Sequence, residues 1–289
     1  MKALSVSMFI ILISCVCAHG SDIAFYVGQW NTDGWYDASQ FDDVEAIIEG
    51  TRGMFDEVVQ FDDDQLDEFG AWAEANADDD KFDIIWLNGC MPSCLYPFPN
   101  QEPDGSLAEL WLDGGNMFIN LGDWFAYVSY ECGARCSENG PTGAANILDL
   151  SSGIIVSDDS GPPFDATPAA KKYVPSLDDP CRSVRPVVLS QVQAPWEVAL
   201  ILASPGGEED PAKAVRADPV VIHNTETGGY LAIVNQASIS CCGNVGWLTD
   251  RAQVCVELIK NWVGEALSLL SVEPAGKLTT TWGGVKHYY

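Results

Sequence analysis

The hexapeptide FDIIWL at residues 82–87 is the clearest indication of the fold in this sequence. A short apolar run of this kind, with β-branched and aromatic side chains, is typical of a buried strand. Similar runs occur at residues 23–28 (IAFYVG), 57–61 (EVVQF) and 116–121 (NMFINL). Together they predict four strands of one sheet.

Three stretches with helical periodicity separate these strands, at residues 39–48, 66–73 and 106–112. Apolar side chains recur in them at the spacing of one helix face, which predicts amphipathic helices. Helices that alternate with strands in this way form right-handed crossovers between parallel strands. The sequence therefore predicts an α/β fold with a flavodoxin-like, doubly wound and mostly parallel sheet.

The second half of the chain is less regular. Residues from about 131 to 190 are rich in Gly, Pro, Ser and Asp, so they predict a loop-rich insertion pinned by disulfides. A strand is predicted at residues 196–202. Residues 219–223 and 230–234 predict a hairpin that gives the sheet an antiparallel edge, and residues 249–267 predict a final amphipathic helix.

The N-terminus has the pattern of a cleavable signal peptide over residues 1–20. Lys2 supplies a positive charge, residues 3–16 are apolar, and small side chains surround Ala18. The apolar run is shorter than the roughly 20 residues that a spanning helix needs, so we expect no membrane span. We expect a secreted or extracellular protein. In a bacterium the lipobox-like LISC offers the alternative of a lipoprotein anchored at Cys15.

These boundaries divide the chain into three parts. The signal peptide occupies residues 1–20, a single α/β domain occupies residues 21–267, and a C-terminal tail without periodicity occupies residues 268–289.

Cysteines are numerous after the predicted cleavage site, and an even number of them in an exported chain predicts disulfide bonds. The candidates are Cys90, Cys94, Cys132, Cys136, Cys181, Cys241, Cys242 and Cys255. Their spacing leaves the pairing open. Zinc is an alternative at the two Cys-x-x-x-Cys pairs, but the spacing is unusual and neighbouring His is absent, so we predict no metal there.

The chain is strongly acidic, with a formal net charge of −28. This charge repels nucleic acid and anionic membranes, so neither is an expected partner. Residues 62–64, 78–80 and 208–210 are acidic runs that offer oxygen ligands to Ca²⁺, or else simply solvate loop ends. They support one hypothesis of function, a non-enzymatic acidic extracellular or surface protein that binds Ca²⁺ or a protein partner. No other cofactor is predicted.

Three segments carry a family resemblance: residues 83–89 (DIIWLNG), 103–109 (PDGSLAE) and 114–123 (GGNMFINLGD). They resemble class I glutamine amidotransferase-like domains, nearest to the trehalose-utilisation (ThuA-like) members, over roughly residues 23–267. Catalytic members of this family carry a cysteine nucleophile that is assisted by a His and an acid. The resemblance implies that the matching position in this sequence is the turn after the strand at residues 116–121. Here that turn reads LGDW and holds no Cys, so we expect glutaminase activity to be absent.

Two residues are candidates for remaining catalysis, Asp123 in that turn and His223. His223 is the one imidazole in the predicted domain, and it could act as a base with Asp218 or Asp123. The alternative is a structural histidine. No Gly-x-Ser-x-Gly elbow or phosphate-binding glycine loop is present in the sequence.

Open α/β sheets bind ligands at the carboxyl ends of their strands. Polar and aromatic side chains follow three of the predicted strands, and carboxylates and amides beside indole rings suit a carbohydrate. We therefore predict that a small polar ligand, foremost a carbohydrate, binds to a non-glutaminase domain through Gln29, Trp30, Asp33, Asn88, Tyr96 and Trp124. The alternative is that the tryptophans fill the core.

Overall fold

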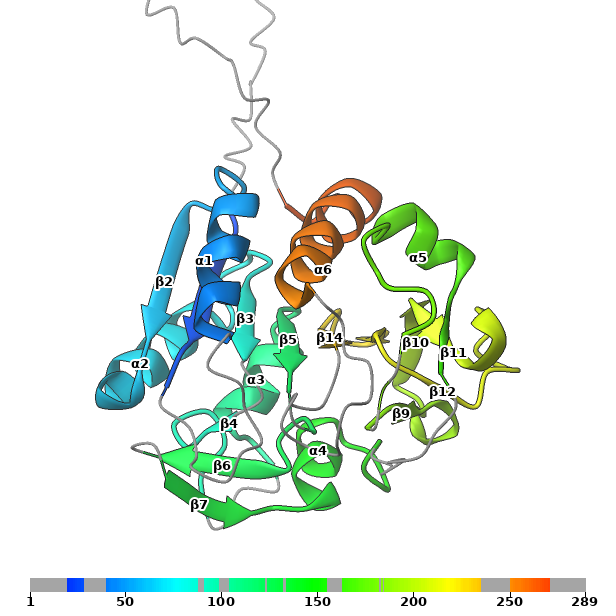
Figure 1. Cartoon of the computed structure of the whole chain (residues 1–289). Helices are drawn as coiled ribbons and strands as arrows, with labels where there is room; N and C mark the ends of the chain where they lie inside the picture. The colour runs from blue at the N-terminus through cyan, green and yellow to red at the C-terminus, as the bar shows by residue number, and fades with distance from the viewer. Residues whose placement is uncertain are drawn as a thin grey trace, which may run out of the picture.

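The computed structural model describes residues 20–28, 40–87, 91–98, 104–122, 124–131, 134–154, 163–181, 183, 185–234 and 250–270. Its centre is a seven-stranded sheet in the order β10-β13-β14-β5-β3-β1-β2 (Figure 1). These strands are β1 (Asp22–Tyr26), β2 (Glu57–Phe61), β3 (Ile84–Leu87), β5 (Met117–Leu121), β10 (Trp196–Ile201), β13 (Val220–Asn224) and β14 (Tyr230–Val234).

Five neighbouring strands of the sheet, from β2 to β14, are parallel. Strand β13 pairs antiparallel with β14, and β10 pairs antiparallel with β13 and forms the edge. The predicted mixed α/β architecture with a mostly parallel sheet and an antiparallel edge is confirmed. The predicted hairpin forms, but its second strand, β14, lies inside the sheet beside β5.

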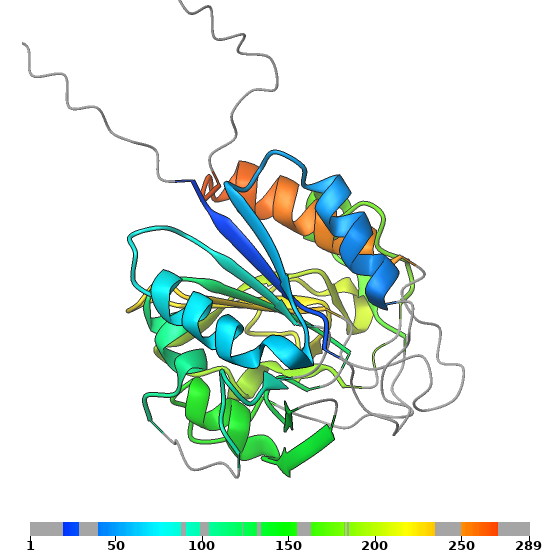
Figure 2. The same ribbon diagram turned by 90° about the vertical axis from the view of Figure 1, so that its left-hand side faces the viewer.

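Helices cover both faces of the sheet (Figures 1 and 2). Helix α1, helix α5 and helix α6 with its π-helical continuation pack on one face, and α2, α3 and α4 pack on the other. Their bounds are α1 (Gln40–Gly50), α2 (Leu66–Asn76), α3 (Leu107–Asp113), α4 (Pro141–Ile147), α5 (Pro168–Tyr173), α6 (Arg251–Glu257) and the continuation Leu258–Ala266. A doubly wound arrangement is consistent with these two layers.

The alternation of side chains along the strands explains the two cores. In β1, Ile23 and Phe25 belong to the core with α1 and α6, whereas Ala24 and Tyr26 belong to the core with α2 and α3. Successive residues of a strand point to opposite faces, and a parallel sheet buries both. This burial explains why the strand reads as an unbroken apolar run.

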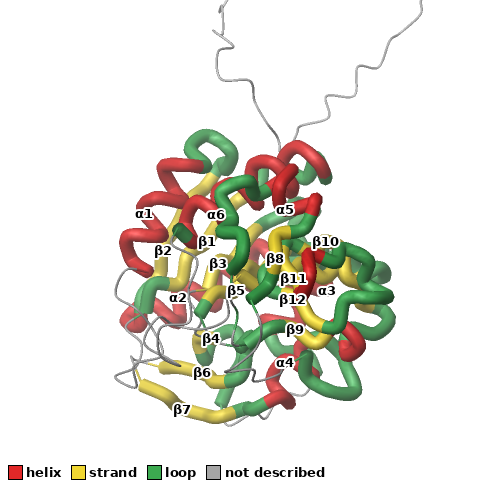
Figure 3. Tube along the Cα trace, turned by 45° about the vertical axis from the view of Figure 1, so that its right-hand side comes forward, coloured by secondary structure: helices red, strands yellow, loops and turns green. Residues whose placement is uncertain are grey.

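Smaller elements lie beyond the carboxyl ends of the parallel strands. Strands β4 (Met91–Pro92), β6 (Val128–Glu131) and β7 (Ala134–Glu138) form a second sheet near α4 (Figures 1 and 3). Two short strand pairs accompany them, β8 (Asp165–Ala166) with β11 (Ala203–Ser204) and β9 (Val187–Val188) with β12 (Arg216–Ala217). The predicted insertion at residues 131–190 thus contains short strands and helices as well as loops.

The prediction of disulfides is wrong for the three cysteines whose side chains are described. Cys94, Cys181 and Cys255 are free thiols. Cys94 packs against the core with α2 and α3, whereas Cys181 and Cys255 lie in the core on the opposite face of the sheet. The remaining candidates, Cys90, Cys132, Cys136, Cys241 and Cys242, lie outside what the structure describes.

The predicted signal peptide, except Gly20, and the predicted tail from residue 271 onward lie outside the described residues. Among the helices that the structure describes, none has the length and apolar character needed to cross a membrane.

Candidate functional site

The carboxyl edge of the parallel strands is where the ligand site is expected. Strands β1, β3 and β5 end there at Tyr26, Leu87 and Leu121. The predicted site residues that follow them directly lie outside the described residues: Gln29, Trp30, Asp33, Asn88 and Asp123. The structure places the other three, Tyr96, Trp124 and His223.

Strands β1 and β2 are tied together at this edge. The hydroxyl of Tyr26 donates a hydrogen bond to Asp63 Oδ1 over 2.6 Å. A Cβ added to Gly28 would lie 2.3 Å from the Tyr26 hydroxyl oxygen and 2.4 Å from Asp63 Oδ1. The chain therefore passes directly over this hydrogen bond as it leaves β1, and a residue without a side chain is needed for that approach.

Tyr96 is part of the core and offers no surface to a ligand. Its side chain is fully buried, and Asn146 Nδ2 donates to its hydroxyl over 2.9 Å. Burial raises the pKa of Tyr96; the hydrogen bond from Asn146 opposes this, and the nearby carboxylate of Glu109 adds to it. The predicted direct contact between Tyr96 and a ligand therefore has no support in the structure.

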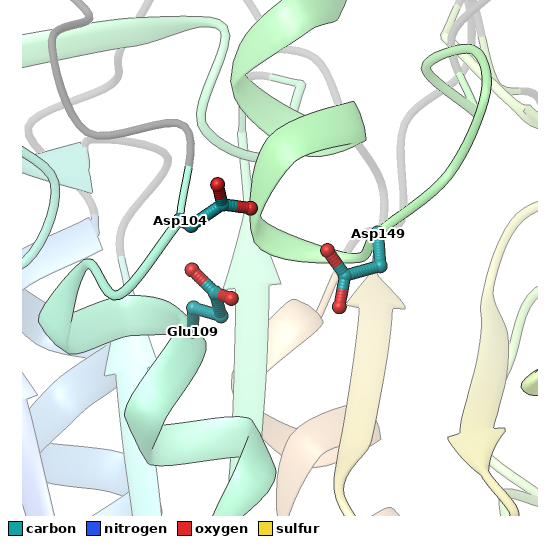
Figure 4. Close-up of side chains that lie close together, drawn as sticks. All are labelled: Asp104, Glu109 and Asp149. Atoms are coloured by element: carbon teal, nitrogen blue, oxygen red, sulfur yellow. The ribbon is translucent and has the colours of Figure 1, made fainter.

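An acidic triad lies next to Tyr96 on the side of the sheet covered by α3 and α4. Asp104 precedes α3, Glu109 lies in its first turn, and Asp149 follows α4 (Figure 4). One carboxylate oxygen from each lies within 4.8 Å of the others. Hard carboxylate oxygens at this spacing are the ligands that Ca²⁺ prefers, so these residues could hold a cation.

Glu109 is the buried member of the triad. Its Oε2 accepts a hydrogen bond from the backbone N–H of Gly105 over 2.5 Å. Burial raises its pKa, the hydrogen bonds from Gly105 and Ser106 lower it, and the charges of Asp149 and Asp113 raise it further. The repulsion among these carboxylates decreases when a proton or a cation occupies the cluster.

Other acidic residues were the predicted Ca²⁺ ligands, and in the structure several of them form helix caps or ion pairs with nearby residues. Asp62 caps a 3₁₀ turn, Asp63–Gln65, by accepting from the N–H of Asp64. Asp79 pairs with Lys81 over 3.3 Å, and Asp210 pairs with Lys213 over 2.8 Å. The triad was missed because its members come from segments about 40 residues apart, which leave no local motif.

Trp124 lies close to the carboxyl end of β5, as predicted, and contacts a buried arginine. The guanidinium Cζ of Arg185 lies 4.1 Å from the Trp124 ring centroid, and the Tyr127 ring lies 4.8 Å from it. Arg185 is only 5% exposed. An indole ring beside a buried cation can stack on the C–H face of a sugar, while the cation favours polar or anionic groups.

Asp218 and Ser183 extend this cluster toward β13. Ser183 Oγ donates to the carboxylate of Asp218 and accepts from the backbone N–H of Arg185 over 3.2 Å. Asp218 is 1% exposed and comes shortly before β13 begins. Asp218 was an expected partner of His223, whereas the structure places it beside Ser183.

The predicted pairing of His223 with Asp218 is wrong. The backbone N–H of Asp218 donates to the carbonyl oxygen of Ala203, beyond the carboxyl end of β10, whereas His223 pairs in register with Glu197 near the amino end of β10. His223 pairs in register with Tyr230, at the amino end of β14, whereas Leu121 of β5 pairs with Val234 at the opposite end. The imidazole stacks on the ring of Tyr230 at 4.4 Å, and its Nδ1 lies 3.5 Å from Glu197 Oε1. His223 therefore lies at the edge opposite to the expected ligand site.

Comparisons with known proteins identify no family for this chain. No family model matches the chain, and no curated protein matches it. Among solved structures, the cytoplasmic protein STM3548 from Salmonella typhimurium is similar, with a TM-score of 0.44 and 10% identity over 82% of this chain and 97% of that chain. A likeness at this level does not bear on the amidotransferase resemblance.

The expected secreted or extracellular localisation, with its lipoprotein alternative, is corrected. Cys94, Cys181 and Cys255 are free thiols, whereas disulfide bonds between such cysteines are typical of exported chains.

Proposed function

We propose that this chain is a glutamine amidotransferase-like (ThuA-like) domain that lacks glutaminase activity and binds or processes a small polar ligand of the carbohydrate class. The proposed site is the carboxyl edge of β1, β3 and β5. The observation that carries the proposal is the order of the strands at that edge.

The strand order supports a site between β1 and β3. Strand β1 is followed by α1 on one face of the sheet, whereas β3 is followed by α3 on the other. The parallel strands run β2-β1-β3-β5-β14, which matches a flavodoxin-like order. In such sheets ligands bind where the chain connections diverge to opposite faces, beyond the carboxyl ends of the strands.

The state of the cysteines supports the lack of glutaminase chemistry. The turn after β5 reads LGDW, and an aspartate cannot replace a thiolate nucleophile. Burial raises the pKa of Cys94, Cys181 and Cys255 to about 12, so these thiols remain protonated and unreactive near neutral pH.

Trp124 and Asp123 are the residues that test the proposal. We expect calorimetric titration to detect one or more mono- or disaccharides, and we expect Trp124→Ala and Asp123→Asn to weaken that binding by about tenfold or more. His223→Ala is the matched control, because its side chain lies at the opposite edge of the sheet. No binding by the unaltered chain, or an equal loss in His223→Ala, would contradict the proposal. An ammonia assay with glutamine should give no signal above buffer.

A second candidate function is cation binding, and the acidic triad favours it. Asp104, Glu109 and Asp149 bring three carboxylates within 4.8 Å. If Ca²⁺ binds there, it should raise the melting temperature, and a chelator should reverse the shift. Asp149→Asn should abolish the shift, whereas Glu74→Gln, an exposed change on α2, should retain it. A shift that persists in Asp149→Asn would assign the cation to another place.

A further inference from the structure

Strand β2 is the open edge of the seven-stranded sheet. It pairs with β1, and no other described strand pairs with it. The N–H of Glu57 points toward β1, where it donates to Asp22 Oδ1 over 2.8 Å, and the C=O of Phe61 accepts from Val27 over 2.8 Å. Because backbone groups alternate along a strand, Val58 and Gln60 direct their N–H and C=O groups to the outer side.

This edge is also exposed on one face. Helix α1 packs against α6, and Val58 remains 43% exposed on that side of the sheet. Figure 2 shows β2 toward the viewer, between α1 and α2. Proteins usually protect such an edge with Lys, Pro or a covering segment, and EVVQF contains neither Lys nor Pro.

The segment of sequence that contains β2 is strongly negative. Residues 40–87 contain 16 Asp and Glu side chains but only two basic ones, Arg52 and Lys81. The net charge of this segment is therefore −14, which is half of the chain's net charge of −28. Both basic side chains form ion pairs within the protein: Arg52 pairs with Glu49, and Lys81 pairs with Asp22 over 3.0 Å.

Helix α2 brings part of this charge close to the strand. Trp72 Nε1 donates to Glu57 Oε2 over 3.0 Å, so this side of α2 touches β2. Glu68 lies one helical turn before Trp72 on the same side of α2, and it is exposed. On α1, Glu45 is exposed as well.

We propose that the outer edge of β2 binds an extended, basic peptide segment of a partner protein as an additional strand. The backbone groups of Val58 and Gln60 provide the strand pairing, and the acidic side chains on α1 and α2 select Lys and Arg. A second copy of this chain is a poor occupant, because two molecules of net charge −28 repel each other.

The test is a binding measurement with a fluorescent peptide of alternating Lys and Thr. Gln60→Pro removes an outward N–H and leaves the ladder to β1 intact, so we expect about tenfold weaker binding or worse. Gln60→Thr is the matched control, because it retains the N–H, and it should bind as the unaltered chain does. The proposal would be overturned if Gln60→Pro bound the peptide as tightly as the unaltered chain does. It would also be overturned if the unaltered chain bound a peptide N-methylated on alternate residues as tightly as the unmethylated peptide.

Variants that remove charge distinguish binding at the β2 edge from attraction to the overall negative charge of the protein. The double change Glu45→Gln and Glu68→Gln should weaken binding several-fold and reduce its salt dependence. The matched change Glu208→Gln and Glu209→Gln, near β11, should have little effect. If both double variants weakened binding equally, the peptide would bind through overall net charge and not at β2, which would overturn the proposal.

Hydrogen exchange tests the proposal if Gln60→Pro does not fold. Addition of the peptide to the unaltered chain should slow exchange of the Val58 and Gln60 amides, because they become hydrogen-bonded. Unchanged exchange at both amides would overturn it. Slow exchange that depends on protein concentration without peptide would identify a second copy as the occupant and would also overturn it.

Discussion

The backbone N–H of Asp22 donates to Asp83 Oδ1 over 2.6 Å, so the first residue of β1 contacts the residue that directly precedes β3 at the amino edge of the sheet. Asp83 is fully buried, and its Oδ2 has no hydrogen-bond partner among the residues that the structure describes. Burial raises the pKa of Asp83 to about 7; the Asp22 N–H opposes this, Asp79 and Asp22 add to it, and Lys81 lowers it. The protonated carboxyl is therefore the form that the fold favours.

This pKa predicts a loss of stability as pH rises toward 7. A pKa raised in the folded state gives stability that is complete below the ordinary value and is lost as pH passes the folded value. The window is therefore between about pH 4 and 7. We expect Asp83→Asn to remove this dependence and to stabilise the protein above pH 7 by at most about 4 kcal/mol. Urea unfolding at pH 5 and pH 8 measures it, with the exposed Asp165→Asn as control. Parallel pH profiles for Asp83→Asn and the unaltered chain would refute the assignment.

The hydrogen bonds of the buried Asn116 side chain predict that its truncation to Ala lowers the free energy of unfolding substantially. Its Oδ1 accepts from the N–H of Asp83 over 2.9 Å, and its Nδ2 donates to the carbonyl oxygens of Asn76 and Ala77. Asn116→Ala leaves these buried backbone groups without partners and should cost about 2 to 4 kcal/mol. Urea unfolding of Asn116→Ala against Asn76→Ala, which removes one local bond, measures the difference. Similar midpoints for the two variants would contradict this role.

Two glycines predict opposite responses to the same substitution. A Cβ on Gly114 would lie 1.6 Å from the carbonyl oxygen of Ala77, so Gly114→Ala forces the backbone apart and should cost about 2 to 3 kcal/mol. A Cβ on Gly70 would meet Cys94 Cβ at an ordinary 3.5 Å. Gly70→Ala lies inside α2 and should stabilise the protein by about 1 kcal/mol. Thermal unfolding of both variants decides, and a stabilised Gly114→Ala would disprove the close contact.

The free thiols predict slow chemical modification. At a pKa of about 12, roughly one thiol in ten thousand is ionised at pH 8. We expect Cys94, Cys181 and Cys255 to resist iodoacetamide in the native protein and to react fully in urea without a reductant. Peptide mass spectrometry reads each site separately. A site that stays unlabelled in urea until reductant is added would reveal a disulfide and would contradict the free state of that cysteine.

The strands of the parallel sheet were accessible to sequence reasoning because burial on both faces leaves an unbroken apolar run. This holds for β1, β3 and β5, all of whose apolar residues are buried. The position of β14 beside β5 was not accessible, because the order of strands depends on pairing between distant segments. Local periodicity carries no information about that pairing.

The candidate site was accessible only in part. Trp124 could be placed near the carboxyl edge because it directly follows a recognisable strand. The error about His223 arose because direction within an antiparallel strand decides which end of the sheet a residue occupies. The acidic triad and Arg185 depend on segments that meet only in the folded chain, so no spacing rule identifies them.

The pairing of β5 with β14 has a consequence for synthesis of the chain. Leu121 and Val234 are partners although roughly 110 residues separate them. A ribosome that has released residues up to 195 therefore presents a four-stranded sheet whose β5 edge, with Met117 and Ile119, awaits its neighbour. Until β14 emerges, the outer backbone groups of β5 have no strand partner, and an unpaired strand edge of this kind can pair with other chains.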